Sequence, residues 1–128
     1  MIKHWSEFQG SPNRVEKDVA RVTLNQRGVL LLNSLAYEAM EAPAAVTLLF
    51  DENNKVIGLR PADIRHQNSF PVKQKDKWHN RTIHASPFCK HFKINVERTV
   101  LFNEVDVDNE GVMKLDLTRT TSIGRGRW

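Results

Sequence analysis

The chain has 128 residues, a hydrophobic content of 40%, a charged content of 27% and a formal net charge of +4 at pH 7. These values are typical of one soluble globular domain. No run approaches the roughly 18 apolar residues of a membrane helix, and the single cysteine, Cys89, excludes an internal disulfide framework.

The first residues lack the apolar core of a secretion signal, and together with the lone cysteine they predict a cytoplasmic protein without a membrane contact. The positive charge is unevenly distributed. Residues 60–98 carry three acidic side chains and nine basic ones: Arg60, Arg65, Lys73, Lys75, Lys77, Arg81, Lys90, Lys93 and Arg98. A basic region attracts phosphate groups; a solvated linker is the alternative.

The N-terminal arm, residues 1–17, has no clear period, and we expect Trp5 and Phe8 to anchor it on the body by burying their rings. Val19–Leu24 alternates apolar and polar side chains, which predicts a half-buried strand. The turn Asn25–Gly28 follows, and Val29–Leu32 is short and apolar enough for a buried strand.

Asn33 or Ser34 can cap a short helix, because either side-chain oxygen accepts an exposed backbone N–H. Ala36 and Met40 would share its inner face, and Pro43 ends it. The hairpin that follows consists of Val46–Phe50, the turn Asp51–Asn54 and Lys55–Leu59.

Residues 60–78 are polar and basic and are predicted to be a connector, with an edge strand at Ser69–Val72 because an edge tolerates Pro71. Arg81–His84 is the next predicted strand. Ser86 then starts a second helix as its cap, with Pro87 at the first helical position.

The second helix would turn Phe88 and Phe92 inward, with Lys90 and Lys93 outward. A second hairpin is predicted from Thr99–Val105 and Val112–Leu117 around the turn at residues 108–111, and residues 118–128 form a basic tail that we expect to be mobile.

Residues 31–50 and 83–102 are similar when the sequence is shifted by 52 positions, with four of twenty residues identical. This similarity predicts an internal repeat within one domain. Repeat one spans 19–61, a connector 62–78, repeat two 79–117 and the tail 118–128. The predicted fold class is mainly β (α+β), with two short helices and two strand–helix–hairpin repeats.

The order strand, glycine turn, strand, short helix and hairpin resembles one half of the AbrB/SpoVT/MraZ superfamily of swapped-hairpin barrels. Gly28 through Met40 and Val46–Leu59 carry the resemblance, and a tandem copy is similar to the MraZ arrangement. The resemblance implies a pseudo-twofold β-barrel and a small transcriptional regulator that binds duplex DNA through a basic face.

The chain also departs from the AbrB pattern. Val29 replaces an arginine, Asn33 replaces a proline, and Tyr37 and Glu38 stand where an arginine often meets phosphate. The remaining candidates for nucleic-acid contact are Arg21, Arg27, Arg81, Lys90, Arg125 and Arg127. The departures favour a second hypothesis, a protein-interaction module such as an antitoxin-like or assembly subunit, and homo-oligomerisation stays open.

Other site types are less well matched. A zinc site could be formed by His79, His84, Cys89 and His91, and a nucleophile pair by Cys89 with His91. The spacing of these residues instead favours Cys89 as a core residue. Asp106–Gly111 begins like a calcium loop, yet Leu117 stands where a bidentate glutamate is required. We therefore expect no metal, no cofactor and no enzyme activity.

Overall fold

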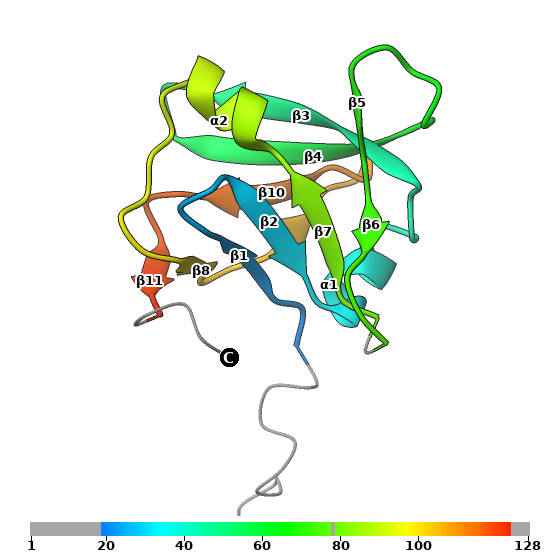
Figure 1. Cartoon of the computed structure of the whole chain (residues 1–128), viewed down its shortest axis with the longest axis horizontal. Coiled ribbons are helices and arrows are strands. Elements are labelled where there is room, and N and C mark those ends of the chain that lie inside the picture. The colour runs from blue at the N-terminus through cyan, green and yellow to red at the C-terminus, as the bar shows by residue number, and fades with distance from the viewer. Residues whose placement is uncertain (1–18, 78, 124–128) are drawn as a thin grey trace, which may run out of the picture.

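The computed structural model describes residues 19–77 and 79–123, which form two antiparallel sheets and two short helices (Figure 1). The six-stranded sheet has the order β11-β8-β1-β2-β7-β6, and the five-stranded sheet has the order β5-β3-β4-β10-β9. The elements are β1 (Val22–Leu24), β2 (Val29–Leu32), α1 (Ser34–Ala39), β3 (Ala45–Asp51), β4 (Val56–Ala62), β5 (Ser69–Pro71), β6 (Lys73–Gln74), β7 (Arg81–His84), α2 (Ser86–His91), β8 (Val100–Phe102), β9 (Asp106–Val107), β10 (Met113–Asp116) and β11 (Thr120–Ser122). The prediction of a mainly β protein with two short helices is confirmed.

The core lies between the two sheets, because alternate residues of a strand point to opposite faces. The six-stranded sheet contributes Val22, Leu24, Leu30, Leu32 and Ile83, and the five-stranded sheet contributes Val46, Ile57, Leu59, Met113 and Leu115; all are buried. This apolar layer is the main stabilising contribution to the fold.

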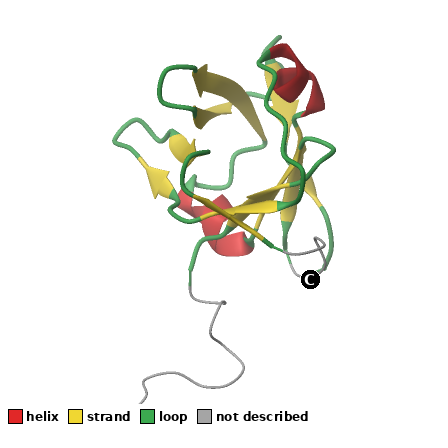
Figure 2. Ribbon diagram, turned by 90° about the vertical axis from the view of Figure 1, so that its left-hand side faces the viewer, coloured by secondary structure: helices red, strands yellow, loops and turns green. Residues whose placement is uncertain are grey.

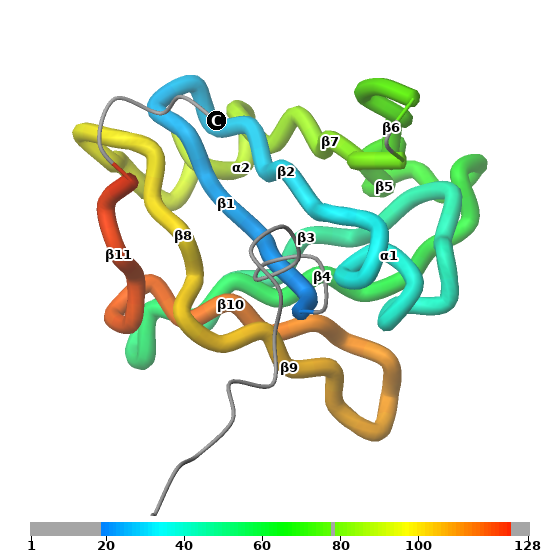
Figure 3. Tube along the Cα trace, turned by 90° about the horizontal axis from the view of Figure 1, so that it is seen from below, coloured from blue at the N-terminus to red at the C-terminus, as the bar shows by residue number. Residues whose placement is uncertain are grey.

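The prediction that the first strand is half-buried is wrong for β1, whose three residues are all buried. Thr23 on the outer face is only 3% exposed. It pairs with Leu31 on one side and Leu101 on the other, because β1 lies between β2 and β8 (Figure 3).

The two helices have the same bounds when shifted by 52 residues, and their C-terminal hydrogen bonds match. The backbone N–H of Ala42 donates to Tyr37 O at 3.1 Å, and the N–H of Ile94 donates to Cys89 O at 2.8 Å. Such a bond closes a helix end through a left-handed residue; here the residue is Glu41 in one helix and Lys93 in the other.

The N-terminal caps differ. Asn33 caps α1 as expected, because its Oδ1 accepts a hydrogen bond from the backbone N–H of Ala36 at 2.9 Å. The predicted Ser86 cap is wrong: α2 begins at Ser86 itself, and Ala85 occupies the cap position without a side-chain hydrogen bond.

The first predicted hairpin is confirmed as β3 paired with β4, and the edge strand near Ser69 is confirmed as β5. The second predicted hairpin is confirmed at its turn, residues 108–111, where β9 pairs with β10, but it is wrong for Thr99–Val105 as the partner strand. Strand β8 pairs with β1 and β11 in one sheet, while β10 pairs with β4 and β9 in the other. Because both edges of β8 and both edges of β10 already have partners, the two strands do not pair with each other.

The predicted closed barrel is also wrong, because the strands form two separate sheets. The sheets approach along β5 and β6, which Val72 alone separates, but β11 and β9 leave the other edges unjoined. The predicted tail is also corrected, because Thr120–Ser122 form β11 and pair with β8. Residues 1–18, with Trp5 and Phe8, and residues 124–128 lie outside the described part of the chain.

The helices lie at opposite ends of the molecule (Figures 1 and 2). At the α2 end, the ring centroid of Phe50 from β3 lies 6.1 Å from that of Phe88 and 5.1 Å from that of Phe92. Edge-to-face and tilted ring pairs stabilise such a cluster beyond their apolar burial. The cluster fixes α2 against the five-stranded sheet.

Candidate nucleic-acid interface

The outer face of the six-stranded sheet carries a row of hydroxyl and apolar side chains that ends in a lysine. The paired residues across the sheet are Thr121, Leu101, Thr23, Leu31, Thr82 and Lys73. They lie on the face opposite the core because they alternate with the buried residues along each strand.

The strands of this sheet contain no acidic residue, whereas the strands of the five-stranded sheet contain Asp51, Asp106 and Asp116. Basic residues occur in both. Lys73 and Arg81 lie in the strands of the six-stranded sheet, which contain no carboxylate, although Asp76 follows β6 closely. This asymmetry favours an anionic partner on the six-stranded side.

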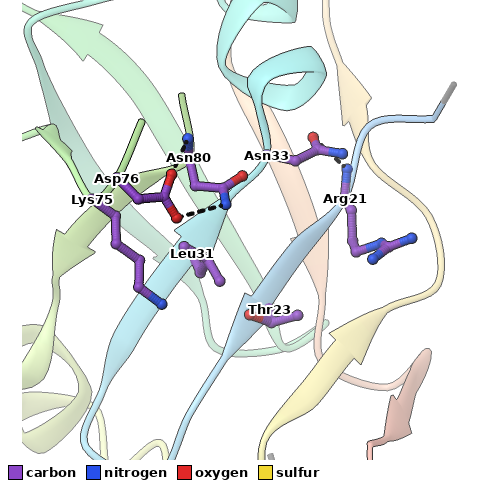
Figure 4. A pocket seen from close by; sticks show the side chains of 7 residues that line it. All are labelled: Arg21, Thr23, Leu31, Asn33, Lys75, Asp76 and Asn80. Carbon is purple, nitrogen blue, oxygen red and sulfur yellow. Dashed lines mark hydrogen bonds between the residues drawn. The ribbon is translucent and has the colours of Figure 1, made fainter. Parts of the chain in front are cut away.

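A pocket of about 280 Å³ opens on this face (Figure 4). Arg21 and Lys75 lie on opposite sides of it, with Thr23 and Leu31 between them. The remaining lining residues are Asn33, Asp76 and Asn80. The two cations are suited to the oxygens of a phosphate.

Asn33 holds one wall of this pocket. Its Oδ1 accepts hydrogen bonds from the N–H groups of Arg21, at 3.0 Å, and Ala36, at 2.9 Å, while its Nδ2 donates to Val19 O at 2.8 Å. One side chain therefore fixes the start of α1 and the backbone of Arg21 together. The proline expected from AbrB-like chains has neither group.

The opposite wall is held by Asp76 and Asn80. The Nδ2 atom of Asn80 donates to Asp76 Oδ2 at 3.2 Å, and its backbone N–H donates to Asp76 Oδ1 at 3.4 Å. The backbone N–H of Lys75 donates to Asn80 O at 2.8 Å, which places Lys75 at the mouth. The negative charge of Asp76 is thus engaged by hydrogen bonds within the wall.

Arg27 and Lys90 lie at the other end of the β1–β2 hairpin. Both line a hollow of about 240 Å³ between the turn Asn25–Gly28 and α2. The N–H of Ala85 donates to Gly28 O at 2.8 Å, which holds the turn against the start of α2. Both cations are exposed, so they are available to a ligand in solvent.

Arg81 is placed differently from the other predicted residues. Its guanidinium carbon lies 4.5 Å from the centroid of the Tyr37 ring, within the range of a cation–π contact. Because Arg81 alternates with Thr82, it lies on the other face of β7.

The structure therefore brings together Arg27 with Lys90 and Arg21 with Lys75, and it separates Arg81 from both pairs. Arg125 and Arg127 lie outside the described residues. Sequence reasoning missed Lys75 as a site residue; the alternation of Lys73 and Lys75 in an extended segment is the signal that could have found it.

The residues raised for other chemistries have structural roles. Cys89 is 6% exposed in the core, and burial raises the pKa of its thiol, which opposes nucleophilic activation. The carboxylate of Asp108 accepts hydrogen bonds from the N–H groups of Glu110 and Val112, as in a hairpin turn. Across residues 19–77 and 79–123, no three His, Cys, Asp or Glu side chains are grouped to hold a metal ion.

The comparisons with known proteins give no relative. No protein-family model matches the chain, and no curated protein or solved structure matches it. Neither helix in the described part of the chain is long and apolar enough to cross a bilayer.

Proposed function

We propose that this protein binds nucleic acid through phosphate contacts on the outer face of the six-stranded sheet and the adjoining β1–β2 turn. The observation that carries the proposal is the pocket that Arg21 and Lys75 flank, on a sheet whose strands contain no carboxylate. Phosphate contacts supply most of the sequence-independent affinity for DNA.

The spacing of the two cationic pairs supports an extended partner. Arg21 precedes β1 and Arg27 lies in the turn after it. At about 3.3 Å per extended residue, the two positions are roughly 10–15 Å apart. This distance corresponds to about three or four base-pair steps of duplex DNA, so one duplex can contact both pairs.

Fluorescence anisotropy with a labelled DNA duplex tests the proposal. If each of the four cations contacts one phosphate, a fourfold rise in salt should lower the affinity about 150-fold. The double variants Arg21→Gln/Lys75→Gln and Arg27→Gln/Lys90→Gln should each weaken binding and reduce the salt dependence by about two counterions.

Arg60→Gln/Lys114→Gln is the matched control, because it also removes two exposed cations, from β4 and β10 of the other sheet. It should leave affinity and salt dependence unchanged. Absence of binding at 50 mM salt, or an equal loss in the control, would contradict the proposal.

The α1 end supports a second candidate function, a protein-interaction module. Glu38 and Glu41 are exposed there, and the charge of Arg81 faces Tyr37. Acidic side chains at this place repel phosphate and suit a basic protein partner. Co-purification of one discrete partner, unchanged by nuclease, would distinguish this function from DNA binding.

The finer architecture that we propose is an internal duplication of a swapped-hairpin unit, as in AbrB- and MraZ-like proteins. The matched bounds of α1 and α2, 52 residues apart, support it. The antiparallel pairing of β2 with β7, which immediately precede the two helices, also supports a rough twofold relation. In the second copy, β8 would have lost its hairpin pairing with β10, because β11 pairs with β8 and β9 pairs with β10.

A further inference from the structure

A second cavity lies beside the segment that follows α2, away from the outer face of the six-stranded sheet. It has a volume of about 280 Å³ and lies between elements of both sheets. Its apolar lining comes from Phe50, Phe92, Ile94, Val96, Val100 and Leu117. Because the sheets do not join between β8 and β10, this side of the core remains open to solvent.

Two lysines, Lys55 and Lys93, also line the cavity, and both are exposed. The other polar lining residues are Asn95, Thr118 and Thr120. Among residues 19–77 and 79–123, no carboxylate lines the cavity. The charge of its rim is therefore positive, while its interior is apolar.

Both lysines have a left-handed backbone, with φ of 60° for Lys55 and 58° for Lys93. Glycine adopts this conformation without the steric cost that a Cβ atom brings. Hydrogen bonds fix these positions: the N–H of Leu117 donates to Lys55 O at 2.9 Å, and the N–H of Ile94 donates to Cys89 O at 2.8 Å. Both lysines therefore line one cavity at backbone positions that glycine would occupy without this steric cost.

We propose that this cavity binds a small amphipathic carboxylate, with its apolar body against Phe50, Phe92 and Leu117 and its carboxylate between Lys55 and Lys93. The volume is near the lower end of the range for small-molecule sites. An apolar body gains from leaving water, and charge-assisted hydrogen bonds to ammonium groups select the carboxylate. This cavity adjoins the hollow beside Arg27 and Lys90, with which it shares Ile94, Asn95 and Val96, but it is lined by different cations.

Isothermal titration calorimetry with decanoate, below its micellar concentration, tests the proposal. We expect one decanoate per chain and at least tenfold weaker binding of decanol and decyltrimethylammonium. Equal binding of the three probes would overturn the proposal, because the lysines would then select nothing.

Substitution of the two lysines by glycine separates the ligand contact from the fold. Lys55→Gly and Lys93→Gly should each weaken decanoate binding about tenfold, while the thermal midpoint stays the same or rises. Lys114→Gln should change neither quantity. Unchanged decanoate binding in the Lys55→Gly/Lys93→Gly double variant would overturn the proposal.

Self-association is the competing use of an open apolar cavity. Sedimentation velocity of the unmodified protein, with and without decanoate, distinguishes it. A monomer in both conditions supports the proposal; a dimer that the double glycine variant dissociates would assign the cavity to a second copy of the chain and overturn it.

Discussion

Gly28 lies so close to Ser86 that a Cβ atom on Gly28 would be 2.8 Å from the Ser86 Cα atom. The β1–β2 turn and the start of α2 are therefore in contact only because residue 28 has no side chain. This contact places Arg27 beside Lys90, so the proposed nucleic-acid interface depends on a residue that carries no charge.

Gly28→Ala should destabilise the protein by about 2–4 kcal/mol, because it combines a left-handed strain with overpacking against backbone. The φ of Gly28 is +81°. Urea denaturation measures the free energy of unfolding. Gly111→Ala is the control: its φ is +83°, but its nearest neighbour is the Pro61 Cγ atom at 4.0 Å.

The control should therefore lose only the strain component, about 1–2 kcal/mol. Equal losses in Gly28→Ala and Gly111→Ala would show that the contact with Ser86 adds nothing. A Gly28→Ala protein that still folds should also bind DNA more weakly, because the turn must move away from α2.

Asn33→Ala should cost about 2 kcal/mol of stability, at the upper end for a helix cap, because it also removes the acceptor for Arg21 N–H and the donor to Val19 O. Ser86→Ala should change stability by less than about 0.5 kcal/mol, since its side chain makes no cap hydrogen bond. Urea denaturation of the two variants measures both changes in the free energy of unfolding. Similar losses would contradict the conclusion that Asn33 caps α1 while Ser86 does not cap α2.

Acid should destabilise the protein through Asp51, Asp108 and Asp116. Hydrogen bonds hold the pKa of each carboxyl below its ordinary value of 3.8: from the Asn54 side chain first for Asp51, the Val112 N–H for Asp108 and the Thr118 side chain for Asp116. Their stabilising contribution is complete above the unfolded-state pKa. It is lost as the pH falls through the lower pKa of the folded protein.

Thermal midpoints measured between about pH 5 and pH 2 should show this loss. In Asp108→Asn, the side-chain oxygen can still accept from the N–H groups of Glu110 and Val112, but it has no charge to titrate. This variant should show a shallower fall with acid. A fall as steep as that of the unmodified protein would contradict the role of Asp108.

Cys89 should react slowly with thiol reagents in the folded protein. Burial limits access to its sulfur and raises the pKa of the thiol, which leaves little thiolate. We expect the folded chain to react with Ellman's reagent at least about 100-fold more slowly than the urea-unfolded chain. Because the chain has one cysteine, the absorbance reports this residue alone; rapid labelling without urea would indicate an accessible, activated thiol.

The local elements were largely predictable because their signals lie within a few neighbouring residues. The Asn33 cap, the hairpin of β3 and β4, the edge strand at Ser69 and the inward faces of Ala36, Met40 and Phe88 all follow from side-chain type and spacing. The exception is Ser86, which was expected to be the cap of α2 but is its first residue. The cap position is occupied by Ala85, whose backbone N–H donates to Gly28 O.

Strand partnership beyond the first hairpin was not predictable. Nothing local distinguishes a β8 that pairs with β10 from one that pairs with β1, and short strands such as β6, β9 and β11 carry weak periodicity. Arg21 and Lys75 line the same pocket because β6 pairs with β7. This strand pairing does not follow from the residues next to either cation.

The amino-acid sequence by itself determined the short helices, the tight turns and the excess of basic residues in 60–98, because these depend on neighbouring side chains. The tertiary structure alone decided which strands became neighbours, which cations share a pocket and that the two sheets stay apart beside Lys55 and Lys93. Each of those outcomes depends on competition among distant strand edges for the same hydrogen-bond partners, a competition that no local pattern encodes.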